Sequence, residues 1–151
     1  MRVSAKADYA VRAALELAAA GGGPLKGDQI SSAQGIPGKF LENILIDMRH
    51  AGLVRAQRGP EGGYWLDRPA SEIALGDVIR AVEGPLASVR GEAPESVSYP
   101  ESVEPLQRVW IALRASLRAV VDRVTLADVI TGELPPDVAR LTEDPEAWVR
   151  R

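Results

Sequence analysis

Glycine and proline divide the first half of this chain of 151 residues into short segments, and this spacing constrains the fold more than any other feature. Residues 21–24 (GGGP) end one apolar segment, Gly35 ends a second and Gly52 ends a third. Glycine readily adopts the left-handed backbone that closes a helix. Residues 58–63 hold three glycines and one proline, which is typical of a hairpin loop. The spacing therefore predicts short helices followed by a hairpin.

Apolar residues recur at helical spacing between these breaks. In the third segment Leu41, Ile44, Leu45 and Met48 follow the pattern i, i+3, i+4, i+7, which predicts a helix with one buried stripe. Ser4 is a plausible N-cap for the first helix. We expect helices at about 5–20, 27–34, 36–51 and 75–82, and strands at 53–57 and 64–66.

The second half of the chain has a different pattern. Residues 88–105 are rich in Pro, Ser and Glu, and we expect a mobile loop there. A long helix is predicted over 106–124, because its apolar residues alternate in steps of four and three, as in a coiled-coil seam. That seam consists of Leu106, Trp110, Leu113, Leu117, Val120 and Val124. The predicted units are 1–87, the loop 88–105, the helices of 106–132 and a charged tail at 133–151.

The composition excludes several kinds of site. The chain has no cysteine and a single histidine, His50, which rules out disulfides, thiolate metal sites and cysteine-ligated iron–sulfur clusters. Gly38-Lys39 resembles the end of a phosphate loop, but Phe40 stands where Ser or Thr is needed. We therefore expect no enzyme, no metal and no cofactor.

No apolar run approaches the roughly 20 residues of a membrane span, and the first residues lack the apolar core of a secretory signal. A cytoplasmic protein without a membrane partner is therefore expected. The net charge is −3, yet residues 1–70 carry nine basic and seven acidic side chains while residues 71–151 carry nine and fourteen. The first part could therefore meet a polyanion that the second part avoids.

The order of elements over 27–66 is that of a winged helix-turn-helix, a mainly α fold with a small β-hairpin wing. The outward face of the third helix carries Lys39, Glu42, Asn43, Ile46 and His50. Lysine can bind phosphate or guanine, and asparagine can bind adenine. Glutamate can accept a hydrogen bond from a cytosine amino group, and an apolar side chain can contact a thymine methyl group. The alternative is an ordinary solvated helix face, with Ile46 an isolated apolar residue on the surface.

Arg58 lies at the tip of the predicted hairpin, from which an arginine can enter a narrow minor groove. The glycines beside it are interpreted as making the turn only. Lys6, Arg49 and Arg55 are further candidates for contacts with phosphate.

Several stretches together resemble one known family. They are Arg2–Glu16 (RVSAKADYAVRAALE), Gly35-Ile36, Phe40-Leu41-Glu42, Gly52-Leu53-Val54, residues 58–64 (RGPEGGY) and Ile73–Pro85 (IALGDVIRAVEGP). With these motifs the chain resembles the Rrf-type family of bacterial winged-helix transcriptional regulators, the IscR/NsrR/CymR-like proteins, from its N-terminus to about Ile130.

This resemblance implies a homodimer whose long C-terminal helix packs against the partner subunit. It also places DNA-reading positions at Lys39, Glu42, Asn43 and Arg58, of which only Glu42 and Arg58 keep the usual residue type of the family. Family members that bind a cluster carry three cysteines in the loop that corresponds to residues 90–105, and this chain has none. Asp8, where some members place an oxygen ligand, is interpreted as a residue of the first helical turn.

Two functions follow as hypotheses. The leading one is a homodimeric, sequence-specific DNA-binding repressor without an iron–sulfur cluster, which binds a pseudo-palindromic operator and responds to an unidentified effector. The other is a winged-helix sensor or interaction module that binds a protein or a small molecule, which the net acidity and Ile46 favour. Trp110 belongs either to the dimer seam or to an effector pocket formed with residues 75–82 and the proline-rich loop, and Trp65 is expected to pack the wing on the core.

Overall fold

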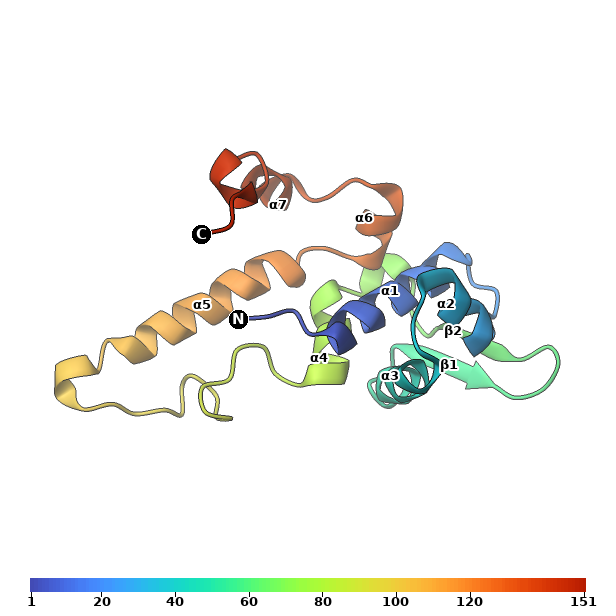
Figure 1. Cartoon of the computed structure of the whole chain (residues 1–151), viewed down its shortest axis with the longest axis horizontal. Helices are drawn as coiled ribbons and strands as arrows, with labels where there is room; N and C mark the ends of the chain where they lie inside the picture. Colours follow the sequence, from blue (N-terminus) through green and yellow to red (C-terminus); the bar gives the residue numbers. More distant parts are fainter.

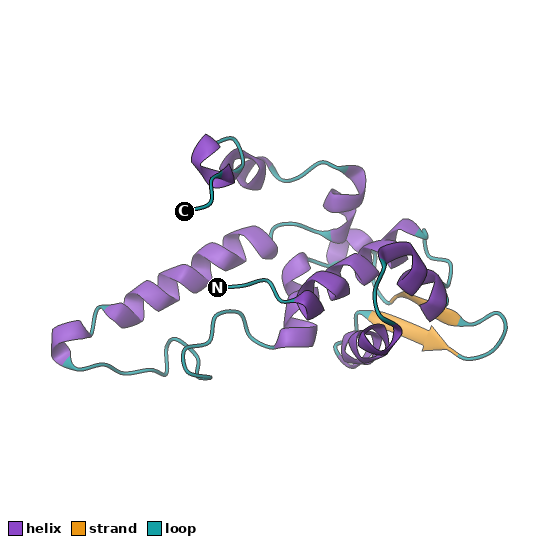
Figure 2. Cartoon of the chain, viewed as in Figure 1, coloured by secondary structure: helices purple, strands orange, loops and turns teal.

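The computed structural model of the chain describes residues 1–151 and is mainly helical, with one small antiparallel sheet (Figures 1 and 2). The predicted fold class is confirmed. The elements are α1 (Ala5–Ala19), α2 (Gly27–Gln34), α3 (Gly38–His50), β1 (Val54–Gln57), β2 (Gly63–Leu66), α4 (Leu75–Glu83), α5 (Leu106–Val121), α6 (Leu126–Thr131) and α7 (Pro136–Leu141), with 3₁₀ turns at 70–72, 101–103 and 145–148.

Local capping explains where the helices begin and end. The Ser4 hydroxyl accepts a hydrogen bond from the amide of Ala7 at 3.0 Å, so Ser4 is the N-cap of α1 as predicted. Gly35 closes α2 with a φ of +61°, a conformation that glycine adopts without a steric penalty. At the start of α6, the side chains of Thr125 and Asp128 accept hydrogen bonds from each other's backbone amides at 3.1 and 2.8 Å, which forms a capping box.

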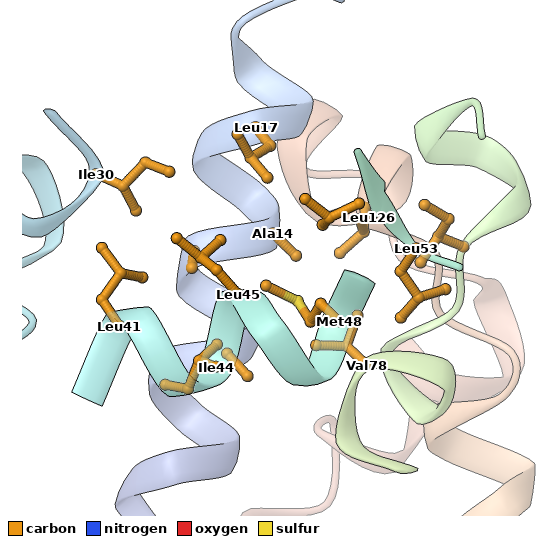
Figure 3. Close-up of a cluster of buried hydrophobic side chains, with 14 of the residues drawn as sticks. Ala14, Leu17, Ile30, Leu41, Ile44, Leu45, Met48, Leu53, Val78 and Leu126 are labelled. Carbon is orange, nitrogen blue, oxygen red and sulfur yellow. The ribbon is translucent and has the colours of Figure 1, made fainter. Parts of the chain in front are cut away.

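The core lies between α1, α2, α3, α4 and α6, and Figure 3 shows its centre. The predicted apolar stripe of α3 faces this core, since Leu41, Ile44, Leu45 and Met48 are all buried. Around them pack Leu17 of α1, Ile30 of α2, Val78 of α4 and Leu126 of α6. Because one face of α3 is fixed in this way, its opposite face must point to solvent.

Helix α5 extends away from this body (Figure 1) and contains no buried residue. It ends at Val121, three residues earlier than predicted. The placement of Val124 in the apolar seam is wrong, because the chain's own core buries this side chain to 3% exposure. Its carbonyl oxygen also accepts a hydrogen bond from the amide of Leu75 at 2.9 Å, which holds the chain against α4 after the helix has ended.

Residues 88–105 were expected to form a mobile loop, yet the structure packs them along α5. The Gln107 amide donates to the carbonyl oxygen of Val97 at 2.7 Å, and the indole nitrogen of Trp110 donates to the Tyr99 hydroxyl at 2.9 Å. Arg114 forms an ion pair with Glu95 at 2.6 Å, and Val97 is buried. Side chains of α5 thus fix a segment whose own composition is poor in apolar residues.

The C-terminal residues 133–151, predicted as a charged tail, contain α7 and a 3₁₀ turn. Pro136 occupies the first position of α7, where its missing amide costs nothing. Val138 is buried, and Arg123 forms an ion pair with Asp137 at 3.3 Å. None of the helices combines the length and the apolar character that a membrane crossing requires.

Candidate nucleic-acid interface

The exposed face of α3 carries most of the predicted site. Lys39, Glu42, Asn43, Ile46 and Arg49 are all exposed, and Ile46 keeps 45% of its surface accessible. His50 is exposed in the last turn, where a positive charge suits the negative end of the helix. The face therefore presents acidic, basic, amide and apolar groups within about four helical turns.

A groove on one side of this face joins α3 to the wing. Glu42, Ile46 and Arg49 line it from the helix. Ala56, Gln57, Arg58, Gly59, Gly63 and Tyr64 line it from β1, the hairpin loop and β2. The structure thus brings together four predicted site residues, Glu42, Ile46, Arg49 and Arg58, that are far apart in the sequence.

The hairpin loop of the wing has a shape that its glycines permit. The two strands pair in the register Val54 with Leu66 through Gln57 with Gly63, which leaves residues 58–62 as the tip. A Cβ atom on Gly62 would lie 2.1 Å from the carbonyl oxygen of Gln57, so no larger residue fits there without moving the backbone. The interpretation that these glycines make the turn agrees with this crowding.

The segment before α2 fixes the wing, and this contact was not predicted. The backbone amide and carbonyl groups of Leu25 exchange hydrogen bonds with those of Tyr64 at 2.9 and 2.8 Å. Leu25 therefore pairs with β2 as a one-residue bridge beside the hairpin. The Lys26 ammonium group donates to the carbonyl oxygen of Gly59 at 2.6 Å and lines the groove beside Arg58. Sequence reasoning missed Lys26 because no local pattern links residue 26 to the loop.

A second hollow lies on the other side of α3, lined by Lys6, Lys39, Phe40, Asn43 and Asp47. Here the predicted phosphate contact Lys6 forms an ion pair with Asp47 at 2.8 Å, which offsets its charge. Phe40 is exposed and meets the ring of Tyr9 edge-on, with centroids 5.7 Å apart.

Other candidate cations differ in whether they are paired. Arg55 forms an ion pair with Asp67 at 3.3 Å. In contrast, Lys39, Arg49 and Arg58 form no ion pair within the chain. These three exposed cations on α3 and the wing are therefore the ones that remain free for the phosphates or bases of a polyanion.

Three further side chains, Asp8, Trp65 and Trp110, lie outside the groove. Asp8 accepts a hydrogen bond from Arg12 one turn later at 3.0 Å, as a structural residue of α1. Trp65 is half-buried on β2. A hollow does lie between α4, residues 84–88 and α5, but Leu117 and Val121 line it rather than Trp110, so the interpretation of Trp110 as a pocket residue gains no support.

Comparisons with known proteins agree with this geometry. Residues 3–132 match the model of the Rrf2 family, described as iron-dependent transcriptional regulators. An HTH-type transcriptional regulator of Mycobacterium tuberculosis is 52% identical over 145 residues, which cover 95% of this chain and 90% of that protein. CymR of Bacillus subtilis is 34% identical over 85% of this chain and 89% of its own length.

Solved structures show the same fold at similar sequence identity. The structure of CymR, the global cysteine regulator of B. subtilis, superposes with a TM-score of 0.72 at 33% identity, covering 87% of this chain and 98% of that one. The structure of IscR from T. potens gives 0.68 at 33% identity, covering all of this chain and 93% of that one. These relatives are regulators of transcription and not enzymes. The exposed helix, the arginine-tipped wing and the family match lead to one conclusion: the chain belongs to the Rrf2 family of DNA-binding winged-helix transcriptional regulators.

Proposed function

We propose that this regulator acts as a homodimeric repressor that binds a pseudo-palindromic operator in double-stranded DNA. The observation that carries the proposal is the groove in which Glu42, Ile46 and Arg49 of α3 face Arg58 of the wing. A helix of this kind fits the major groove while the wing reaches the neighbouring minor groove. Occupation of an operator that overlaps a promoter excludes the polymerase, so repression is the direction proposed.

The apolar seam of α5 supports the homodimer. Trp110, Leu113, Leu117 and Val120 are only half-buried within one chain, and the neighbouring Val109 remains 53% exposed. A helix with this much accessible apolar surface is typical of an interface. A two-fold pair joined along α5 would present two copies of α3 to half-sites about one or two helical turns apart.

We also propose that the chain works without an iron–sulfur cluster, although its family is described as iron-dependent. Cysteine thiolates hold such clusters, and this sequence contains none. The side chains of the fold bring together no group of three or more histidines and carboxylates that could hold a metal ion. The residues present therefore do not fit an iron–sulfur cluster.

The test is a binding selection from random duplex DNA with the full chain at low salt. We expect an enriched motif with two-fold symmetry, and affinity that falls about a thousandfold or more between about 50 and 200 mM salt as phosphate counterions are released. No enriched motif would contradict the proposal.

The exposed apolar residues Ile46 and Phe40 and the net charge of −3 favour a second candidate, a module that binds a protein or small molecule. In that case, binding of a captured partner would change little over the same salt range, and duplex DNA would not compete with it.

Replacement of Arg58 by alanine is expected to weaken operator binding by about 1–3 kcal/mol, mainly at A·T-rich positions beside the half-sites, because an arginine in a narrow minor groove is lost. Fluorescence anisotropy with a labelled operator measures the effect. Arg55→Ala is the matched control, since Asp67 already pairs with that arginine. Unchanged operator affinity of the Arg58→Ala variant would remove Arg58 from the interface.

A further inference from the structure

The C-terminal end of α5 lies directly on the first turn of α4. Asp122, the C-cap of α5, accepts a hydrogen bond from the Arg80 guanidinium group at 2.7 Å. This bond, opposed by partial burial, raises the pKa of Arg80 above its ordinary value. The pair is the charged contact that joins α5 to the winged-helix body.

Gly76 makes this contact possible. A Cβ atom at position 76 would lie 2.0 Å from a carboxylate oxygen of Asp122, which is closer than any real contact of that kind. Gly76 and Arg80 are one helical turn apart on α4 and therefore present the same face to Asp122. Because Gly76 has no side chain, the Asp122 carboxylate can lie directly against the backbone of α4.

Backbone hydrogen bonds tighten the same junction. The amide of Leu75 donates to the carbonyl of Val124, and the amide of Leu126 donates to the carbonyl of Ile73, both at 2.9 Å. Ala74 and Thr125 form the bridge between them. The residues before α4 and the residues after α5 are therefore paired as a short antiparallel ladder.

Helix α4 also supports α3, which is the recognition helix in the proposed DNA-binding function. Val78 of α4 is buried in the same cluster as Ile44 and Met48 of α3, and Figure 3 shows the three side chains together. A continuous packed path thus leads from α3 through α4 to the end of α5.

We propose that Gly76, Arg80 and Asp122 are positioning residues that fix the angle between α3 and α5 and so determine which spacing of operator half-sites the dimer accepts. The inference rests on the proposed function, since only a dimer has two recognition helices to space. In such a dimer the two copies of α3 are connected through the paired α5 helices. They match successive turns of DNA only when the junction between α4 and α5 keeps the same angle in each subunit.

The test uses Asp122→Asn and Gly76→Ala in the full chain, with Asp137→Asn as matched control, because Asp137 also pairs with an arginine near the end of α5. Binding is measured on the selected operator, on operators with one or two base pairs added or removed between the half-sites, and on a single half-site. Thermal unfolding and sedimentation establish that each variant is folded and dimeric.

We expect both junction variants to bind the single half-site within about twofold of the original protein. Their preference for the best spacing over the altered spacings should fall by about fivefold or more, while the control keeps it. An unchanged spacing preference in either folded variant would overturn the inference. If the original protein binds paired sites without any spacing preference, the inference fails while DNA binding stands; if it binds no DNA, the proposed function itself fails.

Discussion

Replacement of Ile44 by alanine is expected to lower the free energy of unfolding by about 2–5 kcal/mol and Tm by roughly 5–15 °C. Ile44 lies on the buried face of α3, where it is fully buried and packs in the core cluster. The truncated side chain leaves a cavity that the helices around it cannot fill without moving. Thermal and urea denaturation followed by circular dichroism measure the loss.

Ile46→Ala on the same helix is the matched control. Ile46 is 45% exposed and lies in the groove between α3 and the wing. Its loss should change stability by about 0.5 kcal/mol or less and act instead on operator affinity. A large stability loss at Ile46, or none at Ile44, would mean that α3 presents a different face to the core.

Replacement of Val109 by glutamate on α5 should convert the proposed dimer into monomers. It should also reduce affinity for paired half-sites about a hundredfold or more, because the second half-site no longer benefits from a tethered partner. Val109 is 53% exposed in the single chain, so the fold of the monomer is expected to survive. Sedimentation velocity and binding to paired and single half-sites measure the two effects.

Val149→Glu is the control for this change. It introduces the same charge at a valine that is similarly exposed, at 57%, and lies outside α5. A Val109→Glu variant that remains dimeric would place the interface between copies elsewhere on the molecule.

Local signals in the sequence predict much of the fold. The apolar stripe of α3, the Ser4 cap and the glycine after α2 each depend on neighbours within a few residues, and each is confirmed. The end of α5 is different, because the apolar spacing continues to Val124 while the backbone leaves the helix to pair with Leu75. Long-range pairing of this kind leaves no periodic trace in the sequence.

The same limit applies to the interface. Helical spacing correctly places Glu42, Asn43 and Ile46 on one exposed face. It cannot foresee that Asp47 offsets the charge of Lys6 or that Lys26 reaches the wing, because these contacts join segments about 30 to 40 residues apart. Likewise, the polar composition of residues 88–105 conceals the partners that Gln107 and Arg114 provide.

The pairing of Leu25 with Tyr64 makes the position of the wing independent of the length of the turn that precedes Leu25. The hairpin is tied to the strand-like residue that follows the exposed glycine turn at 21–24. A turn of this kind tolerates insertions and deletions well. The length of the turn can therefore vary while the two hydrogen bonds between Leu25 and Tyr64 keep the wing in place beside α3.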